Sequence, residues 1–148
     1  MLWGMAFAES FGSLVRQVVN ISQPAAGSIR VHRVACAVDC GTAVNPGSIE
    51  AQMQGGIVHG LSTAFWGQQT FVSGKPQIKN FTAFRMLRGT EMPRVGVTIV
   101  NSGYPVGGIG EVGVPPIGPA VANAYFQLIG IRITSLPFFP NAGGFGDG

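Results

Sequence analysis

Residues 49–65 carry the most regular pattern in the chain, with an apolar residue at every third or fourth position. This spacing places the apolar side chains on one face of an α-helix. Asn45 is a favourable N-cap residue and Pro46 suits the first helical turn, so the sequence predicts a helix that begins at Pro46. The positions that form the apolar face are Ile49, Met53, Ile57, Leu61, Ala64 and Phe65.

The same predicted helix carries three glycines, Gly55, Gly56 and Gly60, on or near its apolar face. A glycine inside a helix costs about 1 kcal/mol relative to alanine. A helix that keeps three of them indicates that another part of the molecule presses closely against its backbone.

Two strand-like segments precede this helix. Residues 5–21 contain β-branched residues toward their end and predict a strand that is interrupted at Gly12. Pro24 and Gly27 favour a turn, and the segment "IRVHRVACAVD" after it predicts a second strand. Residues 5–39 together predict a long antiparallel hairpin.

Shorter elements follow the helix. The segment "QQTFVSGKPQI" predicts a hairpin that turns at Ser73 and Gly74, residues 80–93 are irregular, and "RVGVTIVN" predicts a strand. "PIGPAVANAYFQLIG" predicts a second helix that Gly130 ends, and "IRITSLPF" predicts a last strand.

These elements predict an α+β fold, with antiparallel hairpins, a glycine-rich helix and a C-terminal helix. They form one domain over residues 1–138, and we expect residues 139–148 to be a disordered tail. Hydrophobic residues make up 46% of the chain and charged residues only 10%. A typical soluble domain has about 25% charged residues, so we expect part of this surface to be covered in a larger assembly.

Composition also excludes several classes of function. The net charge of +3 and the lack of stacking aromatics argue against nucleic-acid binding. Residues 112–131 carry no charge, but three prolines and two amide side chains within them argue against a membrane span. The N-terminal residues lack the basic and long apolar stretches of a signal peptide, so the chain shows no targeting signal and its compartment stays open.

The two cysteines, Cys36 and Cys40, predict buried free thiols rather than a zinc site. Their spacing lacks a second ligand pair, and neither His32 nor His59 lies at a usual zinc-ligand spacing from them. Taken alone, His59 predicts a packed or capping residue, and Asp39 predicts local hydrogen bonds to the backbone.

The stretch "GGIGEVG", residues 107–113, allows two interpretations. Its G-x-G-x-x-G pattern matches the turn of dinucleotide-binding domains. However, Pro115 and Pro116 separate these glycines from the next helix, and the next acidic residue after Glu111 is Asp147. A nicotinamide-binding domain needs an acid about twenty residues on, and the first half of the chain predicts antiparallel strands, so this interpretation is the weaker one.

The second interpretation concerns Glu111 itself. No basic residue lies within five positions of it on either side. A buried carboxyl in such surroundings has a raised pKa and can act as a general base. Spacing alone favours the alternative, in which Glu111 caps the following helix or points into water.

Three segments, in this order along the chain, resemble a known family. They are "MAFAESFGSLVRQVVNIS", "VHRVACAVDCGTAVNPGSIEAQMQGGIVHGLSTAF" and "GGIGEVGVPPIGPAVANAYFQLIGIRITSLPF". Together, over residues 4–138, they resemble the C-terminal part of the molybdopterin-binding large subunit of molybdenum hydroxylases, the xanthine dehydrogenase and aldehyde oxidoreductase family. The resemblance implies an oxidoreductase that hydroxylates an aldehyde or an N-heteroaromatic carbon with water as the oxygen source.

The resemblance also implies roles for particular residues. Glu111 matches the family's glutamate beside molybdenum, which acts as the general base. Gln52 matches a glutamine that contacts the pterin, and Gly107, Gly108 and Gly110 match the loop that runs close to the cofactor. The implied cofactor is molybdopterin with molybdenum, in its cytosine dinucleotide form.

The chain departs from the family in two respects. Val112 stands where such proteins often have proline, and the family's large subunit is several times longer. The implied partners are therefore the upstream part of the large subunit, a small subunit that holds iron–sulfur clusters, and a small-molecule substrate. An inactive fragment, or an assembly module that only binds partner chains, is the alternative.

Overall fold

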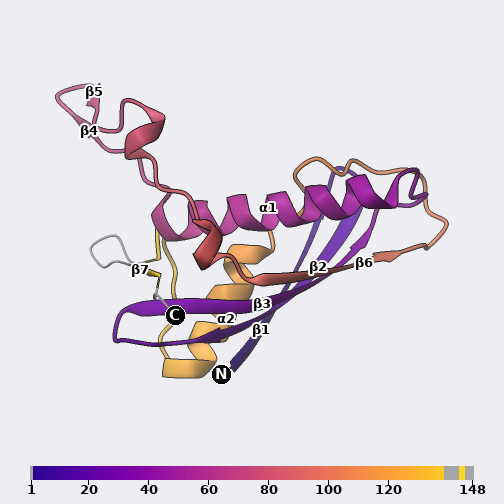
Figure 1. The fold of residues 1–148 in the computed structure, drawn as a ribbon, viewed down its shortest axis with the longest axis horizontal. Helices are drawn as coiled ribbons and strands as arrows, with labels where there is room; N and C mark the ends of the chain where they lie inside the picture. The colour runs from indigo at the N-terminus through magenta and orange to yellow at the C-terminus, as the bar shows by residue number, and fades with distance from the viewer. Residues whose placement is uncertain (1, 139–143, 146–148) are drawn as a thin grey trace.

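The computed structural model describes residues 2–138 and 144–145 (Figure 1). Within these ranges, two α-helices pack on a mixed sheet, which confirms the α+β class. The sheet order is β1-β2-β3-β6, formed by Leu2–Ser10, Ser13–Ser22, Ser28–Asp39 and Arg94–Val100. The helices are α1, Pro46–Trp66, and α2, Ile117–Ile129.

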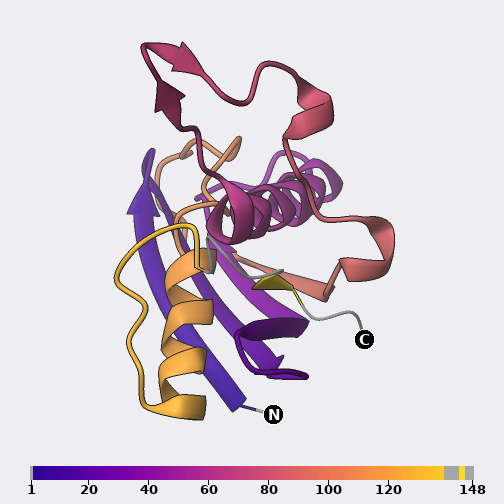
Figure 2. The same ribbon diagram turned by 90° about the vertical axis from the view of Figure 1, so that its left-hand side faces the viewer.

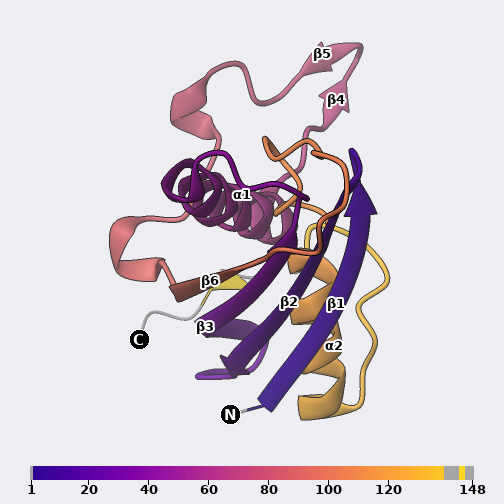
Figure 3. The ribbon, with the colours of Figure 1, turned by 90° about the vertical axis from the view of Figure 1, so that its right-hand side faces the viewer.

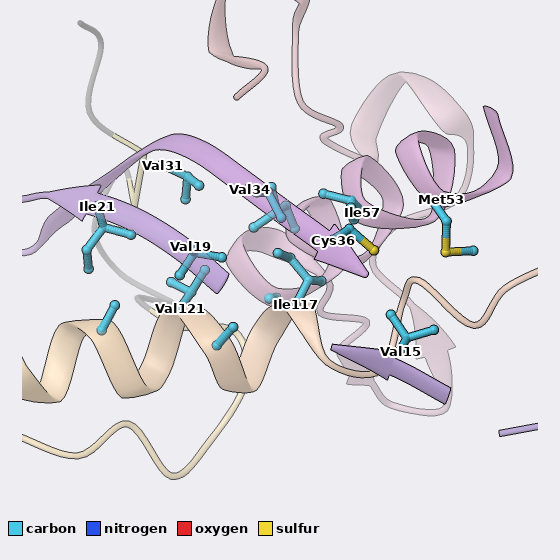
Figure 4. Close-up of a cluster of buried hydrophobic side chains, with 14 of the residues drawn as sticks. Val15, Val19, Ile21, Val31, Val34, Cys36, Met53, Ile57, Ile117 and Val121 are labelled. Carbon is cyan, nitrogen blue, oxygen red and sulfur yellow. The ribbon is translucent and has the colours of Figure 1, made fainter. Parts of the chain in front are cut away.

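Both helices cover the same face of the sheet, with α2 across β1 and β2 (Figures 2 and 3). Alternate residues of β2 and β3 point toward the helices and are fully buried, among them Val19 and Val34, which pair across the strands. Figure 4 shows these side chains between the strands and the residues Ile57, Ile117 and Val121 of the helices. The strands therefore form because their period-two apolar pattern meets two apolar helix faces.

The other face of the sheet, here called the open face, is not covered by either helix. On β1 it carries Trp3, Met5 and Phe7, whose exposed fractions are 51%, 53% and 55%. Across the strands, Met5 aligns with Val18, Ala35 and Gly96 in one row.

The predicted hairpin over residues 5–39 is wrong in one respect, because the segment 5–21 is two strands. Phe11 and Gly12 both have positive φ, 54° and 75°, and they join paired Ser10 and Ser13. A two-residue turn with positive φ at both positions reverses the chain completely. Phe11 is an unusual residue for such a turn, so the sequence predicted only an interruption at Gly12. The structure instead has a full turn, and β1, β2 and β3 form a three-stranded antiparallel meander.

The pairing of β6 was also not predicted. It lies parallel to β3, with Val34 opposite Val95, and α1 belongs to the connection between the two strands. This is a βαβ unit, whereas the sequence predicted antiparallel hairpins alone. The short hairpin of β4, Phe71–Val72, and β5, Lys75–Pro76, lies in the same connection and turns at Ser73 and Gly74 as predicted.

The structure confirms α1 in detail. The side-chain oxygen of Asn45 accepts a hydrogen bond from the Ser48 amide at 3.1 Å, which caps the helix start. All six predicted apolar positions are buried. Gly60 lies against Ile117 of α2, whereas Gly55 has no neighbouring atom where a Cβ would stand. Helix α2 ends at Gly130 in the left-handed conformation, as predicted.

The predicted last strand, "IRITSLPF", is wrong, because residues 131–138 form no helix or strand. This segment runs beside the helices instead of pairing with the sheet. The Phe138 amide donates to the carbonyl of Ala64 at 2.9 Å. The rings of Phe65 and Phe138 pack edge to face, with 5.2 Å between their centroids. Phe138 at the end of the segment thus covers part of α1, whereas Ile131 and Leu136 are exposed.

Most of the predicted disordered tail, residues 139–148, lies outside the described residues. Gly144–Phe145 forms β7 and pairs in parallel with Ser28 and Ile29 of β3. No helix within the described ranges is long and apolar enough to cross a membrane.

The contact between β1 and α2 generates a stability prediction. A methyl group at Gly4 would collide with the Ala120 carbonyl and the Ala124 amide, so we expect Gly4→Ala to destabilise the fold by about 1–3 kcal/mol. Gly96→Ala is the matched control, since Gly96 lies in the same sheet and a methyl group on it would have no atom within 4 Å. Urea denaturation measures both, and equal midpoints would contradict the close contact.

Candidate functional site

The loop of residues 101–116, here called the glycine-rich loop, connects β6 to α2 and contacts three other segments. The Gly107 amide donates to the Cys40 carbonyl at 3.0 Å, and the Gly108 amide donates to the Phe11 carbonyl at 2.7 Å. Further along, Gly113 lies on α1, where a Cβ at Gly113 would stand 3.2 Å from the Met53 carbonyl oxygen. The loop is therefore held by the β1–β2 turn, the β3–α1 connection and α1 itself.

The three glycines that the sequence singled out differ in their surroundings. A Cβ at Gly107 would overlap the Ser13 hydroxyl, and one at Gly108 would stand 2.9 Å from the Cβ of Phe11. At Gly110 no atom lies within 4 Å of that position, and the residue is exposed. Packing within the chain thus accounts for Gly107 and Gly108, and only Gly110 keeps an open backbone that another group could approach.

Glu111 is exposed, while the next residue, Val112, is fully buried. Burial of Val112 fixes the loop on the core and turns the neighbouring carboxylate outward. Among the described residues, this carboxylate has no hydrogen-bond or ion-pair partner, and it does not cap α2. The structure therefore agrees with the expectation that Glu111 points into water within this chain.

Gln52 lies on α1 directly before Met53, which contacts Gly113 of the loop. The contact joins the two segments that carry Gln52 and Glu111. The Gln52 side chain is also exposed, and within the described part of the chain its carboxamide forms no hydrogen bond. The structure thus leaves both predicted site residues exposed, on two segments that meet where Met53 contacts Gly113.

Asp39 holds two connections together at the end of β3. Its Oδ1 accepts from the Gly41 amide at 3.1 Å and from the Ser102 hydroxyl at 2.8 Å. The bond to Gly41 is the local backbone bond that the sequence predicted. The bond to Ser102 was not predicted, because it joins residues 63 positions apart.

Sequence reasoning missed Ser13 and Gln17, which donate hydrogen bonds to the backbone of the glycine-rich loop. The Ser13 hydroxyl donates to the Gly108 carbonyl at 2.6 Å, and the Gln17 amide donates to the Gly113 carbonyl at 2.8 Å. Both residues are fully buried. The sequence did contain a sign of these bonds. In the alternating pattern of β2, Gln17 occupies a position between Val15 and Val19 where an apolar residue is expected.

Cys36 and Cys40 are buried free thiols, as predicted. Among the residues that the structure describes, no group of three His, Cys, Asp or Glu side chains could hold a metal ion. His32 bonds to the Ser22 hydroxyl at 2.7 Å. The prediction that His59 packs or caps is wrong, because its side chain is exposed. Together with Met86 and Met92, His59 lines an open hollow of about 670 Å³.

Burial raises the pKa of the Cys36 thiol to about 11, and the nearby Gln17 amide only partly offsets this effect. At pH 8 roughly one Cys36 side chain in a thousand is then ionised, because the thiolate fraction falls tenfold for each unit below the pKa. We therefore expect very slow alkylation of native Cys36 by iodoacetamide, with fast alkylation in denaturant. Mass spectrometry of the Cys36 peptide measures both rates, and fast native labelling would contradict the raised pKa.

The glycine-rich loop generates a second stability prediction. Gly107→Ala forces the loop away from the β1–β2 turn, and we expect a loss of about 1–3 kcal/mol in the free energy of unfolding. Gly110→Ala is the control from the same loop, and we expect it to leave stability within about 0.5 kcal/mol of the parent. Urea denaturation of both variants tests the difference, which would vanish if the loop were loosely held.

Comparison with known proteins extends these observations. The model of the molybdopterin cofactor-binding domain family matches residues 11–93. Isoquinoline 1-oxidoreductase subunit beta of Brevundimonas diminuta is 34% identical over 141 residues, which is 95% of this chain and 18% of that subunit. The chain therefore spans less than a fifth of that relative's length.

Solved structures share the fold. Quinoline 2-oxidoreductase from Pseudomonas putida 86 superposes with a TM-score of 0.77 at 19% identity, over 86% of this chain and 18% of that one. The aldehyde oxidoreductase from Desulfovibrio desulfuricans gives a TM-score of 0.73 at 18% identity, over 86% and 15% of the two chains. On the family match and the shared fold, the chain belongs to the molybdopterin cofactor-binding domain family of the molybdenum hydroxylases.

Proposed function

We propose that residues 1–138 are the C-terminal portion of a molybdopterin-binding domain in the large subunit of a molybdenum-dependent oxidoreductase, with Glu111 as its general base. The observation that carries this proposal is the state of Glu111. Its carboxylate stands exposed on a loop that is bonded to the fold on both sides, with no partner among the described residues. An unpaired carboxylate on a fixed loop is suited to accept a proton from a bound reactant.

The residues around Glu111 fit such a cofactor chemically. Gly110 leaves its backbone open to close approach, and Gln52 offers an amide that can both donate and accept hydrogen bonds. A pterin presents donors and acceptors of its own, so we infer that Gln52 and the backbone at Gly110 hold the cofactor. Gly107 and Gly108 support the wall of this site from behind, since their own contacts lie inside the chain.

When bound, the molybdenum cofactor supplies the two-electron acceptor and the centre for transfer of an oxygen atom from water. With the cofactor in place, the Glu111 carboxylate would accept the proton that the reacting water loses. The hydrogen-bonded loop fixes the backbone from which the Glu111 side chain projects, which limits the space that its carboxylate must search. Exclusion of water from the site comes from the parts of the subunit that cover this surface.

The names of the similar proteins support a substrate class. Isoquinoline and quinoline are N-heteroaromatic compounds, and one structural neighbour is named for aldehydes. We infer that the substrate carbon of the assembled enzyme belongs to an N-heteroaromatic ring or to an aldehyde.

The remainder of the large subunit is the first partner that we propose. The chain spans 18% of its relative, and the open face of the sheet exposes Trp3, Met5 and Phe7 side by side on β1. Clustered apolar side chains of this size are favourable to bury against another polypeptide. We further propose a small subunit with iron–sulfur clusters as the electron acceptor, and the cytosine dinucleotide form of the cofactor.

The same open face supports a second candidate function, that of an assembly module without catalysis. In that case the chain binds the rest of the subunit but takes no part in the reaction. The two functions differ in whether turnover depends on Glu111. An assembly module needs only its packing surfaces, so a change at Glu111 would leave turnover unchanged.

The test is Glu111→Gln in an enzyme assembled from this chain and the remainder of its large subunit. Loss of a general base lowers turnover by about 100-fold or more, so we expect kcat to fall by at least that factor. Glu50→Gln is the matched control, because Glu50 is also an exposed carboxylate and lies on α1 two positions before Gln52.

Molybdenum content is measured on both variants, so that loss of the cofactor is separated from loss of the base. Full molybdenum with little turnover in Glu111→Gln supports the proposed function. Unchanged turnover in that variant would leave the assembly module as the better description.

A further inference from the structure

Two polar side chains interrupt the apolar face of β2, and both are fully buried. Ser13 and Gln17 occupy positions of the alternating pattern that Val15, Val19 and Ile21 also occupy. An apolar residue at either position would suit the core better, since burying a hydroxyl or an amide costs free energy unless it is hydrogen-bonded. Their presence therefore calls for a reason outside core packing.

Their hydrogen bonds supply that reason. Ser13 donates to the carbonyl of Gly108 at 2.6 Å, and Gln17 donates to the carbonyl of Gly113 at 2.8 Å. Residues 108–113 between these two points carry Glu111. On an extended strand, four residues span about 13 Å, so the two donors are spaced to hold the two ends of a short loop segment.

The buried side chain of Gln17 is not optimal for stability alone. Its Oε1 is buried and has no hydrogen-bond partner in the part of the chain that the structure describes. Its Nε2 also lies 3.9 Å from the Cys36 sulfur, a weak contact. The bond to Gly113 is therefore the main interaction of this amide, and the unsatisfied oxygen remains as its cost.

Each end of the segment 108–113 is fixed by more than one contact. The first end also has a backbone bond from the Gly108 amide to Phe11. At the second end Gly113 lies on Met53 and Gly56, and Gln17 is the donor that fixes its carbonyl. Between the ends, the buried side chain of Val112 faces the core, so Glu111 faces outward.

We propose that Ser13 and Gln17 are positioning residues that clamp the two ends of residues 108–113 and fix the direction in which the Glu111 side chain leaves the backbone. The catalytic meaning of this clamp rests on the proposed function, in which Glu111 is the base. The clamp itself is a property of the loop and is measured without the cofactor.

The first experiment measures hydrogen exchange in the purified chain for Ser13→Ala and Gln17→Met. Three amides report on the loop, those of Gly107, Gly108 and Val114, because each donates a backbone hydrogen bond there. We expect each variant to raise exchange of these amides by about tenfold, since a lost buried hydrogen bond allows the segment to open more often. Amides in the centres of β2 and β3 keep their protection.

Asn20→Leu is the matched control for this experiment. Asn20 is a buried polar residue of the same strand, but its amide donates to the Leu2 carbonyl, away from the loop. We expect this variant to leave the three loop amides unchanged. If Gln17→Met does not fold, Ser13→Ala still tests the other end of the clamp, and unchanged loop exchange in the folded variants would overturn the proposal.

The second experiment measures kinetics of the same variants in the assembled enzyme, at equal molybdenum content. A misplaced base slows the chemical step, so we expect kcat to fall by about 10- to 100-fold while KM stays within about twofold. Asn20→Leu is expected to retain the parent kcat. A change in KM alone, or no change in kcat, would overturn the positioning role.

Glu111→Gln separates the failure of this proposal from failure of the proposed function. If Glu111→Gln loses turnover but the Ser13 and Gln17 variants do not, the positioning role of Ser13 and Gln17 is overturned and Glu111 remains the base. If Glu111→Gln keeps full turnover, the proposed function fails, and the catalytic role of the clamp fails with it, whatever the loop exchange shows.

Discussion

The contact between the glycine-rich loop and helix α1 is the constraint on which the rest of the site depends. Gly56 of the helix and Gly113 of the loop approach each other so closely that a Cβ on Gly56 would stand 3.4 Å from the Gly113 Cα. This approach brings the loop within reach of Gln17, which lies on the strand beneath. Glycine at position 113 permits this approach, because a Cβ there would stand 3.2 Å from the Met53 carbonyl oxygen.

Contacts with the loop and with α2 account for two of the three glycines inside α1, since Gly55 has no neighbouring atom where a Cβ would stand. Ile117 of α2 packs against Gly60 of α1. Glycine lowers the helix propensity of α1, but it allows close packing along the buried face of that helix. Most helical stability in a folded protein comes from such packing of an apolar face. At Gly56 and Gly60 the loss of helix propensity is therefore accompanied by close packing against the loop and α2.

Local chemistry explains which parts of the fold were predictable from sequence. Asn45, Pro46 and the apolar spacing predicted α1, and Gly130 predicted the end of α2, because caps and periodicity act over a few residues. The turn at Phe11 and the parallel pairing of β6 were not predictable in this way. Phenylalanine is an unusual residue at a positive φ, so it gave no signal of a turn, and the pairing of β6 depends on a strand that is distant in sequence, because an alternating strand can pair in either direction.

The candidate site likewise has residues that the sequence indicated and residues that it did not. Family resemblance pointed to Glu111 and Gln52, and the structure joins the segments that carry them through the contact of Gly113 with Met53. It missed Ser13 and Gln17, whose loop partners are 95 and 96 residues away. A polar residue in an apolar strand pattern signals a buried hydrogen bond, but only the folded chain shows which carbonyl accepts it.

The exposure of Glu111 has a physical consequence for the proposed function. A carboxylate buried without a partner would destabilise the fold, whereas an exposed one costs nothing while the chain stands alone. The loop beneath it is already fixed, so its ordering is complete before any partner arrives. Under the proposed function, covering this surface with the rest of the subunit would remove water around the fixed loop that carries this carboxylate, and drier surroundings strengthen the electrostatic interactions of a carboxylate.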